Sequence, residues 1–201
     1  ITVEGGVTAN GLMMTGLHTG SDGGSITVEG DVGVTGNASV AVLAEGGTVT
    51  VGGVSAEGDY YEFMGNWDEE AEEYVGEIEA YPYAIKAAGD AEVTVNGAVT
   101  AAGNEVTAVY AEGSAIVAVT GGVSTEGDGR FTVLAEGGAA VTVTGNVTAS
   151  GGNCYAVAAG GDATVTVTGN VSAEGEDCGA VGTEGGTVTV TGNVAASGAE
   201  S

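Results

Sequence analysis

The amino-acid sequence predicts an all-β protein coiled into a right-handed parallel β-helix, or β-solenoid, of about eight coils with 23 to 25 residues each. Three observations predict this fold class. A V/I-x-V motif recurs along the whole chain, Val alternates with Thr or Ala within each copy, and Gly accounts for 40 of the 201 residues. A repeat of this length cannot bury an apolar face by itself, whereas stacked repeats can.

The spacing of the motif sets the number of coils. Successive intervals are 25, 23, 44, 24, 24, 24 and 23 residues, so one interval is much longer than the others. We therefore expect one solenoid domain over residues 1–201, with an insertion at residues 59–83 between the third and fourth coils. The first apolar residue of each copy is Ile1, Ile26, Val49, Val93, Val117, Val141, Val165 or Val188.

Each unit is expected to contain two or three short strands. In the sixth unit, Val141 and Val143 share one face with period two, while Thr142 and Thr144 share the other. Counterpart strands would pair in register about 4.8 Å apart, and so short a coil leaves room inside only for small side chains. The usual hand of parallel crossovers favours a right-handed solenoid. A second strand is marked at one offset by Val42, Ile85, Val109, Val133, Val157 and Val181.

Asn146, Asn170 and Asn193 each follow a Gly at one offset, where the chain must turn. Asn tolerates left-handed backbone angles, and stacked Asn side chains can hydrogen-bond to one another. We expect this column to have a structural role.

The insertion at residues 59–83 contains seven of the ten aromatic residues, and its middle is acidic. We expect a short helix over Trp67–Glu79, capped by Asn66, with acidic residues near its positive end. Its aromatic side chains are suited to binding a glycan or a protein, and the alternative is that they pack the insertion onto the solenoid. The candidate ligand-binding residues are Trp67, Tyr60, Tyr61, Phe63 and Tyr74.

Outward-facing Thr residues predict a second candidate binding surface. Three coils carry two such residues each, which is the arrangement that ice-binding solenoids present. Other coils interrupt the array, for example at Glu4, Glu29 and Ala118. Thr also favours exposed strands in general. The candidate ice-binding residues are Thr142, Thr144, Thr166, Thr168, Thr189 and Thr191.

The chain is strongly acidic, with 28 Asp and Glu residues against Lys86 and Arg130, and a net charge of −26. This charge argues against nucleic acid and anionic membranes as partners and favours cations or a positively charged partner. The sequence contains no run of about 18 apolar residues, so we expect no membrane-spanning segment in it. Loosely bound Ca²⁺ is a further expectation, although the spacing assembles no closed site. Four acidic residues share an offset: Glu45, Glu112, Glu136 and Glu184.

Cys154 and Cys178 lie at one offset in consecutive units. Stacking would place their Cα atoms about 4.8 Å apart, which is within the range that a disulfide spans. They are a disulfide candidate, and the alternative is two free thiols whose side chains do not reach the required torsion.

The sequence shows no set of catalytic residues. Lys86 and Arg130 lie in different coils at different offsets, and His18, the single His, lies in a Gly-rich corner. No Ser, His and Asp set or nucleophile elbow is visible. A polysaccharide-processing enzyme is the alternative function, because carboxylate pairs are abundant and this architecture supports such enzymes.

The pattern GGxVTVTGNVxAxG resembles the Gly-rich parallel β-helix repeats of bacterial cell-surface adhesins and autotransporter passenger domains. The resemblance covers the chain outside the insertion and carries over no catalytic residues. It implies an extracellular stalk or adhesive module from a larger microbial surface protein, with a glycan or a host-cell protein as partner. The open ends of such a rod would be capped by neighbouring segments or would associate end to end.

Overall fold

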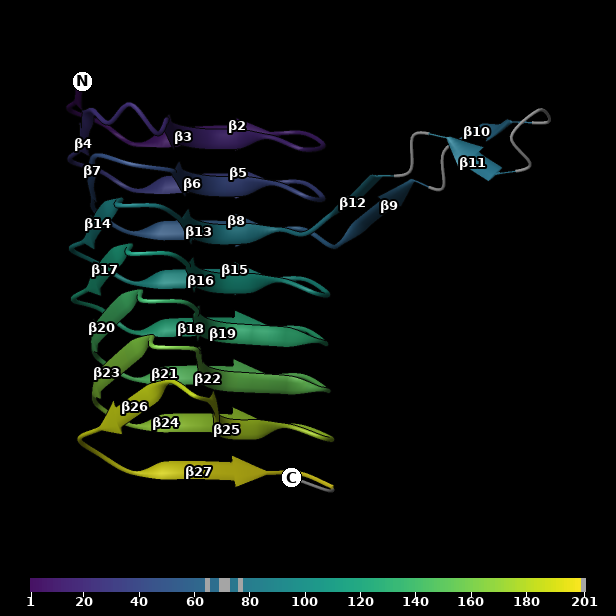
Figure 1. Ribbon diagram of the computed structural model, residues 1–201, viewed down its shortest axis with the longest axis vertical. Coiled ribbons are helices and arrows are strands. Elements are labelled where there is room, and N and C mark those ends of the chain that lie inside the picture. The colour runs from purple at the N-terminus through teal and green to yellow at the C-terminus, as the bar shows by residue number, and fades with distance from the viewer. Residues whose placement is uncertain (64–65, 69–72, 76–77, 200–201) are drawn as a thin grey trace.

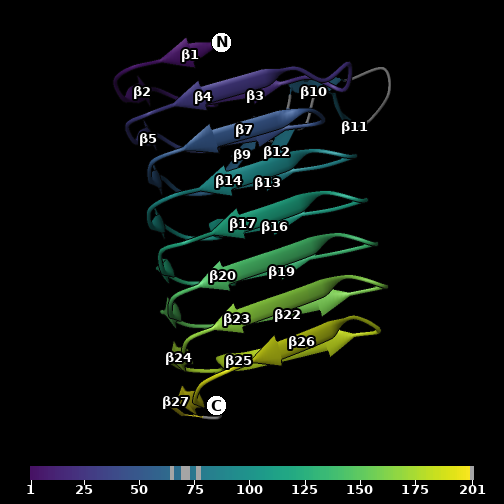
Figure 2. The ribbon, with the colours of Figure 1, turned by 90° about the vertical axis from the view of Figure 1, so that its left-hand side faces the viewer.

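The computed structural model describes residues 1–63, 66–68, 73–75 and 78–199, with side chains for residues 1–63 and 79–199. Within them the chain forms a parallel β-solenoid of about eight coils, drawn as stacked layers in Figures 1 and 2. Followed from the N-terminus in these two views, the chain turns clockwise as it moves away, which is a right-handed course. No helix in the described residues is long and apolar enough to cross a membrane.

Three parallel sheets form the sides of the solenoid. Sheet 1 contains β1 (Thr2–Val3), β4 (Ser25–Val28), β7 (Thr48–Val51), β14 (Glu92–Val95), β17 (Ile116–Val119), β20 (Ala140–Thr144), β23 (Thr164–Thr168) and β26 (Thr187–Val190). Sheet 2 contains β2 (Val7–Asn10), β5 (Val32–Thr35), β8 (Val54–Glu57), β15 (Val99–Ala102), β18 (Val123–Glu126), β21 (Val147–Ser150), β24 (Val171–Glu174) and β27 (Val194–Ser197). Sheet 3 contains β3 (Thr15–Thr19), β6 (Val40–Ala44), β13 (Tyr83–Ala87), β16 (Thr107–Ala111), β19 (Arg130–Ala135), β22 (Cys154–Gly160) and β25 (Gly179–Glu184).

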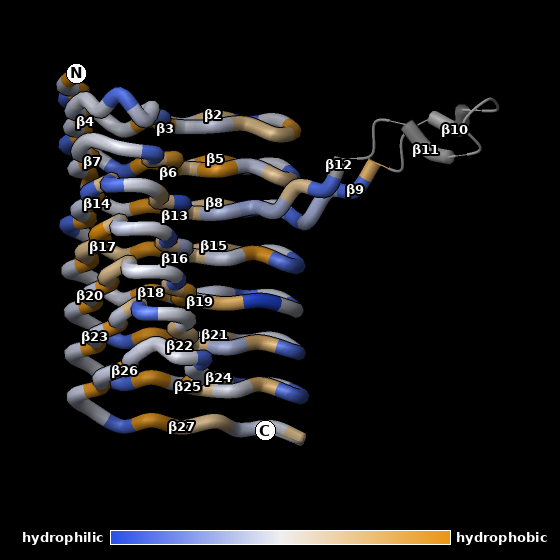
Figure 3. Tube along the Cα trace, in the orientation of Figure 1, coloured by the Kyte–Doolittle hydropathy of each residue, from blue (hydrophilic) through white to orange (hydrophobic). Residues whose placement is uncertain are grey.

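The sequence repeat becomes a column in space, as predicted. Val117 pairs with Val141 and Val141 with Val165, and all three are at most 1 % exposed inside the shaft. The second predicted column, which includes Val109 and Val133, is in register along sheet 3. Figure 3 shows apolar segments recurring at the same place in successive coils. The core consists almost entirely of Val and Ala, because opposite walls of so narrow a shaft leave no room for larger side chains.

Gly residues permit the turn from sheet 2 to sheet 3. Gly103 and Gly127 have φ angles of 131° and 128°, a region that side chains with a Cβ rarely adopt. A Cβ added at Gly103 would collide with the carbonyl oxygen of Gly58 in the coil above. The stacked coils therefore require Gly at this corner for two reasons, the backbone angle and the close approach.

The Asn column is structural, but its hydrogen bonds differ from those expected. The side-chain Oδ1 of Asn146 accepts a bond of 2.9 Å from the backbone N–H of Asn170, whose own Oδ1 accepts one from the N–H of Asn193. The positive φ angles belong to the preceding residues, Gly145 and Gly169, and not to the Asn residues. A backbone N–H at a corner lacks its usual ladder partner, so the Asn oxygen satisfies it instead of bonding to another side chain.

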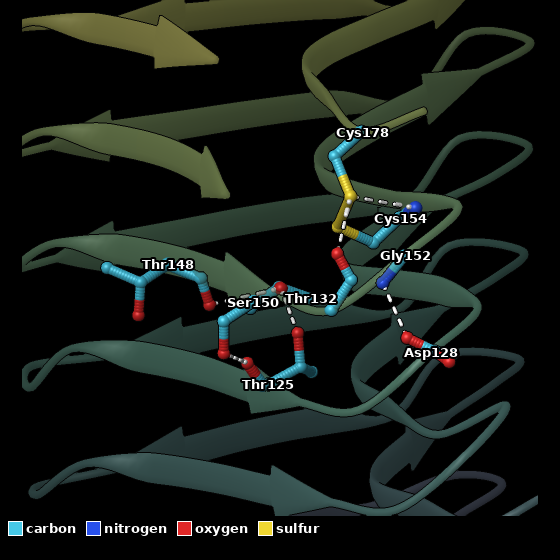
Figure 4. Close-up of a disulfide and its surroundings, with 9 residues drawn as sticks. Thr125, Asp128, Thr132, Thr148, Ser150, Gly152, Cys154 and Cys178 are labelled. Carbon is cyan, nitrogen blue, oxygen red and sulfur yellow. Dashed lines mark hydrogen bonds between the residues drawn. A yellow bond between two sulfur atoms is a disulfide. The ribbon is translucent and has the colours of Figure 1, made fainter. Parts of the chain in front are cut away.

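A second column of this kind lies at the corner between sheets 2 and 3. The Oδ1 of Asp59 accepts a bond of 2.8 Å from the N–H of Asn104. The Oδ1 of Asp128 accepts one of 2.6 Å from the N–H of Gly152 (Figure 4). In the sequence, this column is marked by Asn and Asp residues that alternate after a Gly. The V/I-x-V repeat does not by itself reveal the column.

The insertion leaves the third coil between β8 and β13 and projects from the side of the solenoid (Figure 1). Its described residues include four strands. β9 (Tyr61–Phe63) pairs antiparallel with β12 (Ile78–Ala80), and β10 (Asn66–Asp68) pairs antiparallel with β11 (Glu73–Val75). The position expected between the third and fourth coils thus corresponds to a corner within the third coil.

The short helix expected over Trp67–Glu79 is wrong for the residues described there, which form β10, β11 and the start of β12. Residues 69–72 and 76–77 lie outside the described residues. An isolated acidic helix of this length is marginal in water. Aromatic and β-branched residues favour cross-strand pairing, and Trp67 lies directly opposite Tyr74 in the register of β10 and β11.

Candidate functional site

The outer face of sheet 3 carries two columns of large side chains. One column contains Tyr83, Phe131 and Tyr155, and the other contains Lys86 and Tyr110. Three adjoining hollows of about 400, 370 and 360 Å³ follow these columns along the solenoid axis. We call them together the aromatic groove. Its lining includes Leu43, Glu45, Glu79, Ala80, Tyr81, Tyr83, Lys86, Tyr110, Glu112, Arg130, Phe131, Leu134, Glu136, Tyr155, Ala158, Gly182 and Glu184.

A departure from strict alternation places these side chains outside. In β13, Ala84 and Ile85 are both buried, so the outward positions are Tyr83 and Lys86, three residues apart. β6 and β19 repeat the two consecutive buried residues. Strict alternation of inward and outward residues therefore predicts the inward column through Ile85. It does not predict the outward columns on either side of Ile85. The signal that was available is an aromatic residue two positions before the shared apolar residue.

The aromatic rings of the groove form two stacks along the axis. The ring centroids of Tyr83 and Tyr110 are 5.7 Å apart, and those of Phe131 and Tyr155 are 5.9 Å apart. Each stack joins adjacent coils, which gives a stabilising cross-strand pair on an exposed sheet face.

The two basic side chains of the chain both lie against tyrosine rings of this region. The Nζ of Lys86 is 5.5 Å from the ring centroid of Tyr83 and 5.9 Å from that of Tyr110. The guanidinium carbon of Arg130 is 3.4 Å from the ring centroid of Tyr81, and its Nε donates a bond of 3.1 Å to Glu105. These are cation–π contacts, so rings of the groove already bind cations within the molecule. The sequence placed these two residues in unrelated positions, and only the fold brings them to one surface.

Glu112 and Glu136 stack on adjacent coils as predicted, and a phenol lies between them. The hydroxyl of Tyr110 lies 2.9 Å from Glu112 Oε2 and 2.7 Å from Glu136 Oε2. A phenol has one proton, so it donates to one carboxylate at a time. Burial and these two hydrogen bonds raise the pKa of Tyr110, which keeps the phenol neutral.

The described residues include no group of three or more His, Cys, Asp or Glu side chains arranged to hold a metal ion. His18 lies within β3 and pairs with Leu43, so the Gly-rich corner expected for it is wrong. Its Nε2 is 3.0 Å from Glu45 Oε2, and both side chains are exposed.

The base of the insertion adjoins one end of the groove. Tyr60 packs on Tyr81 with ring centroids 4.7 Å apart, and Glu79, Ala80 and Tyr81 line the first hollow. Burial, followed by the nearby carboxylates of Glu62 and Glu79, raises the pKa of Tyr60 to about 12.

The five predicted ligand-binding residues are not all part of this surface. Tyr60 belongs to it through its contact with Tyr81, whereas Tyr61 and Phe63 lie on β9. Trp67 and Tyr74 are paired in the backbone register of β10 and β11, and their side chains lie outside the described residues.

The Thr array lies on the outer face of sheet 1. Thr142 pairs with Thr166 and Thr166 with Thr189, while Thr144 pairs with Thr168, and Thr191 directly follows β26. The first of these columns is longer than the sequence suggested and is interrupted in the described coils by Ala118. Its Thr members are Thr2, Thr27, Thr50, Thr94, Thr142, Thr166 and Thr189.

Cys154 and Cys178 are joined by a disulfide between the sixth and seventh coils, with Cα atoms 4.6 Å apart (Figure 4). Beside it, the hydroxyls of Thr125 and Thr132 lie 2.6 Å apart in the core. The Thr132 hydroxyl also donates to the carbonyl of Thr148. The polar groups buried near the disulfide thus form hydrogen bonds with one another.

Comparison with known proteins returns no match. Neither protein-family models, nor curated proteins, nor solved structures match this chain. The parallel β-solenoid is defined by the register of its own strands, and the aromatic groove by the side chains that line it.

Proposed function

We propose that this chain is an extracellular structural and adhesive module of a larger microbial surface protein, and that its aromatic groove, together with the insertion, binds an extended glycan. The observation that carries the proposal is the continuity of the groove. Adjacent hollows share lining residues, with Tyr83 and Lys86 in the first two and Phe131 and Leu134 in the second two. A surface that follows the axis over several coils suits a polymer chain better than a compact ligand.

Three further observations support this function. Aromatic side chains with polar neighbours are the usual lining of sites that bind sugars or proteins on a rigid scaffold. A disulfide between coils fits an oxidising compartment, such as the exterior of a cell. The solenoid supplies rigidity because three parallel ladders join successive coils, with two joining the last coil to the seventh.

A deletion that keeps the solenoid tests the contribution of the insertion. Asp59 occupies the corner position of Asn104, and Tyr83 pairs with Thr107. Two residues join Asn104 to Thr107, so deleting residues 60–80 leaves Tyr81 and Pro82 as the two matching residues. The corner is thereby restored to the length used by the other coils.

The experiment compares glycan-array and cell binding of the full chain, the chain lacking residues 60–80, and a Tyr110→Ala, Phe131→Ala double variant. We expect both variants to lose most of the binding while circular dichroism shows an intact β fold. Unchanged binding by both folded variants would overturn the proposal. Binding that is lost on protease treatment of the cells and absent from the glycan array would identify a protein partner instead.

The register of sheet 1 favours a second candidate function, ice binding. The Thr column through Thr142 and Thr166 repeats in seven of the coils at the spacing of the parallel strands. Such a column holds hydroxyls in a regular row on a flat sheet. A face of this kind orders water if its spacing matches a plane of ice.

Faceting of single ice crystals in a dilute sample tests this candidate. We expect a Thr142→Lys, Thr166→Lys variant to abolish faceting. A Thr148→Lys, Ser172→Lys variant on sheet 2, where these two residues also pair, is the matched control and should retain it. Round ice crystals in the wild-type sample would exclude the function.

A further inference from the structure

The two ring stacks of the aromatic groove have similar rings but differ in the charged side chains beside them. Around Tyr83 and Tyr110 the chain supplies its own cation, because Lys86 lies over both rings beside Glu112. The second stack, Phe131 and Tyr155, borders the third hollow, which no Lys, Arg or His lines among the described residues.

The column of Lys86 explains why this hollow is open. In successive coils the outward position of Lys86 is taken by Tyr110, Leu134, Ala158 and Gly182. The side chains therefore become smaller toward the C-terminal end. They leave a hollow of about 360 Å³ beside the Phe131 and Tyr155 rings.

Glycine also makes room for the Tyr155 ring. A Cβ added at Gly179 would collide with the Cε1 atom of Tyr155, and one at Gly182 would lie 3.2 Å from that atom. The ring consequently extends over the next coil, and Tyr155 is 42 % exposed. Part of its surface is accessible to a ligand in the hollow.

Two carboxylates border the same hollow. Glu136 and Glu184 line it on the side of Gly160, and both are exposed. The ion pairs found among the described residues join His18 to Glu45 and Arg130 to Glu105, so they involve neither of these two carboxylates. Lys86 has similar surroundings, because it lies over the Tyr83 and Tyr110 rings in a hollow that Glu112 also lines.

We propose that the hollow between Phe131, Tyr155, Glu136 and Glu184 binds an organic ammonium group. The ring faces attract a cation through their quadrupoles, the carboxylates attract it by charge, and the net charge of −26 favours a cationic ligand over an anionic one. An amino sugar of a glycan and a methylated lysine of a protein both present this group. The proposal uses the groove of the proposed function but does not require that the polymer be a glycan.

The test titrates the full chain with choline and follows the ring resonances of Phe131 and Tyr155 by NMR. The control ligand is the neutral isostere of choline, in which a carbon atom replaces the nitrogen. We expect choline to give saturable shifts and the isostere to bind at least about tenfold more weakly, because it has the same shape without the charge. Equal binding of the two ligands would overturn the proposal.

Matched variants locate the site. Tyr155→Leu and Glu136→Gln should each weaken choline binding severalfold, whereas Tyr155→Phe, which keeps the ring, should retain it. Glu92→Gln, which changes an exposed carboxylate of β14 in sheet 1, should leave binding unchanged. Choline binding unaffected by Tyr155→Leu in a folded protein would contradict the assignment.

Further arms distinguish the source of the ammonium group from the function of the groove. A glucosamine oligomer and its N-acetylated counterpart test an amino sugar, and a trimethyllysine peptide and its unmodified counterpart test a protein. The chain lacking residues 60–80 keeps this hollow, so it should still bind choline. Choline binding without any glycan binding would overturn the proposed glycan function and leave the ammonium site standing.

Discussion

At the residue scale, Tyr110 shows how one side chain makes a stack of carboxylates tolerable. Adjacent coils bring Glu112 and Glu136 close enough to repel, and the neutral phenol offers each a hydrogen bond in turn. The sequence predicted the stacking of the two Glu residues from their shared offset. It did not predict the phenol, because Tyr110 points outward only as a result of the two consecutive buried residues that precede it in β16.

Replacing Tyr110 with Phe should destabilise the protein by roughly 1 kcal/mol, since the ring stack remains but the hydrogen bond to a carboxylate is lost. Urea denaturation measures the difference. The loss should shrink in high salt, where the repulsion between Glu112 and Glu136 is screened. Tyr155→Phe in the neighbouring ring stack is the matched control. A Tyr110→Phe variant as stable as the wild type at low salt would contradict this account.

Tyr60 should titrate far above an ordinary tyrosine. Its pKa is raised from 10.0 to about 12, so the folded protein favours the neutral phenol. The contribution of the neutral Tyr60 phenol to the free energy of unfolding is fully present below about pH 10, where tyrosine is neutral even in the unfolded chain. This contribution is lost as the pH rises through about 12. The difference in tyrosinate absorbance between wild type and Tyr60→Phe should have its midpoint near 12. A midpoint near 10 would show that Tyr60 is solvated and not packed on Tyr81.

At the element scale, strand pairing between coils determines what the local sequence can form. The helix expected over Trp67–Glu79 was inferred from acidic residues after a capping Asn, which is a purely local signal. In the described residues, pairing of β10 with β11 and of β9 with β12 prevails. A strand needs a partner whose position the sequence does not state, so a local reading favours the helix, which needs none.

The disulfide joins Cys154, at the start of β22, to Cys178, which directly precedes β25, and so links the sixth and seventh coils. It closes a loop of 24 residues, for which the loss of chain entropy in the unfolded state corresponds to about 3 kcal/mol. A Cys154→Ala, Cys178→Ala variant should therefore lose up to about this much stability in urea denaturation. A reducing agent should destabilise the wild type by a similar amount and leave the variant unchanged. Equal sensitivity of both proteins to the reducing agent would contradict the prediction.

At the scale of the whole molecule, the solenoid is a rod whose two end coils differ from the rest. β1 and β26 are the outer strands of sheet 1, and β2 and β27 are those of sheet 2, so their outward edges have no strand partner within the described residues. Such edges are templates for pairing with a further strand.

We therefore expect end-to-end association of this chain at high concentration. The average mass from light scattering should rise with protein concentration, and it should rise more in salt, because salt screens the repulsion between molecules of charge −26. Replacing Val188 and Val190 of β26 with Lys should suppress the association. A constant monomer mass at all concentrations and salt levels would refute it.

The sequence by itself determined the solenoid, its coil number and its columns, because each coil must repeat the same small apolar residues to share one shaft with its neighbours. It also indicated the pairing position of Cys154 and Cys178 and the Thr rows. Only the tertiary structure decided the strands of the insertion, the backbone targets of the Asn side chains and the aromatic groove. These depend on contacts between residues of different strands, such as Trp67 opposite Tyr74 and the Asn170 N–H bonded to Asn146, and such contacts leave no mark on the local pattern.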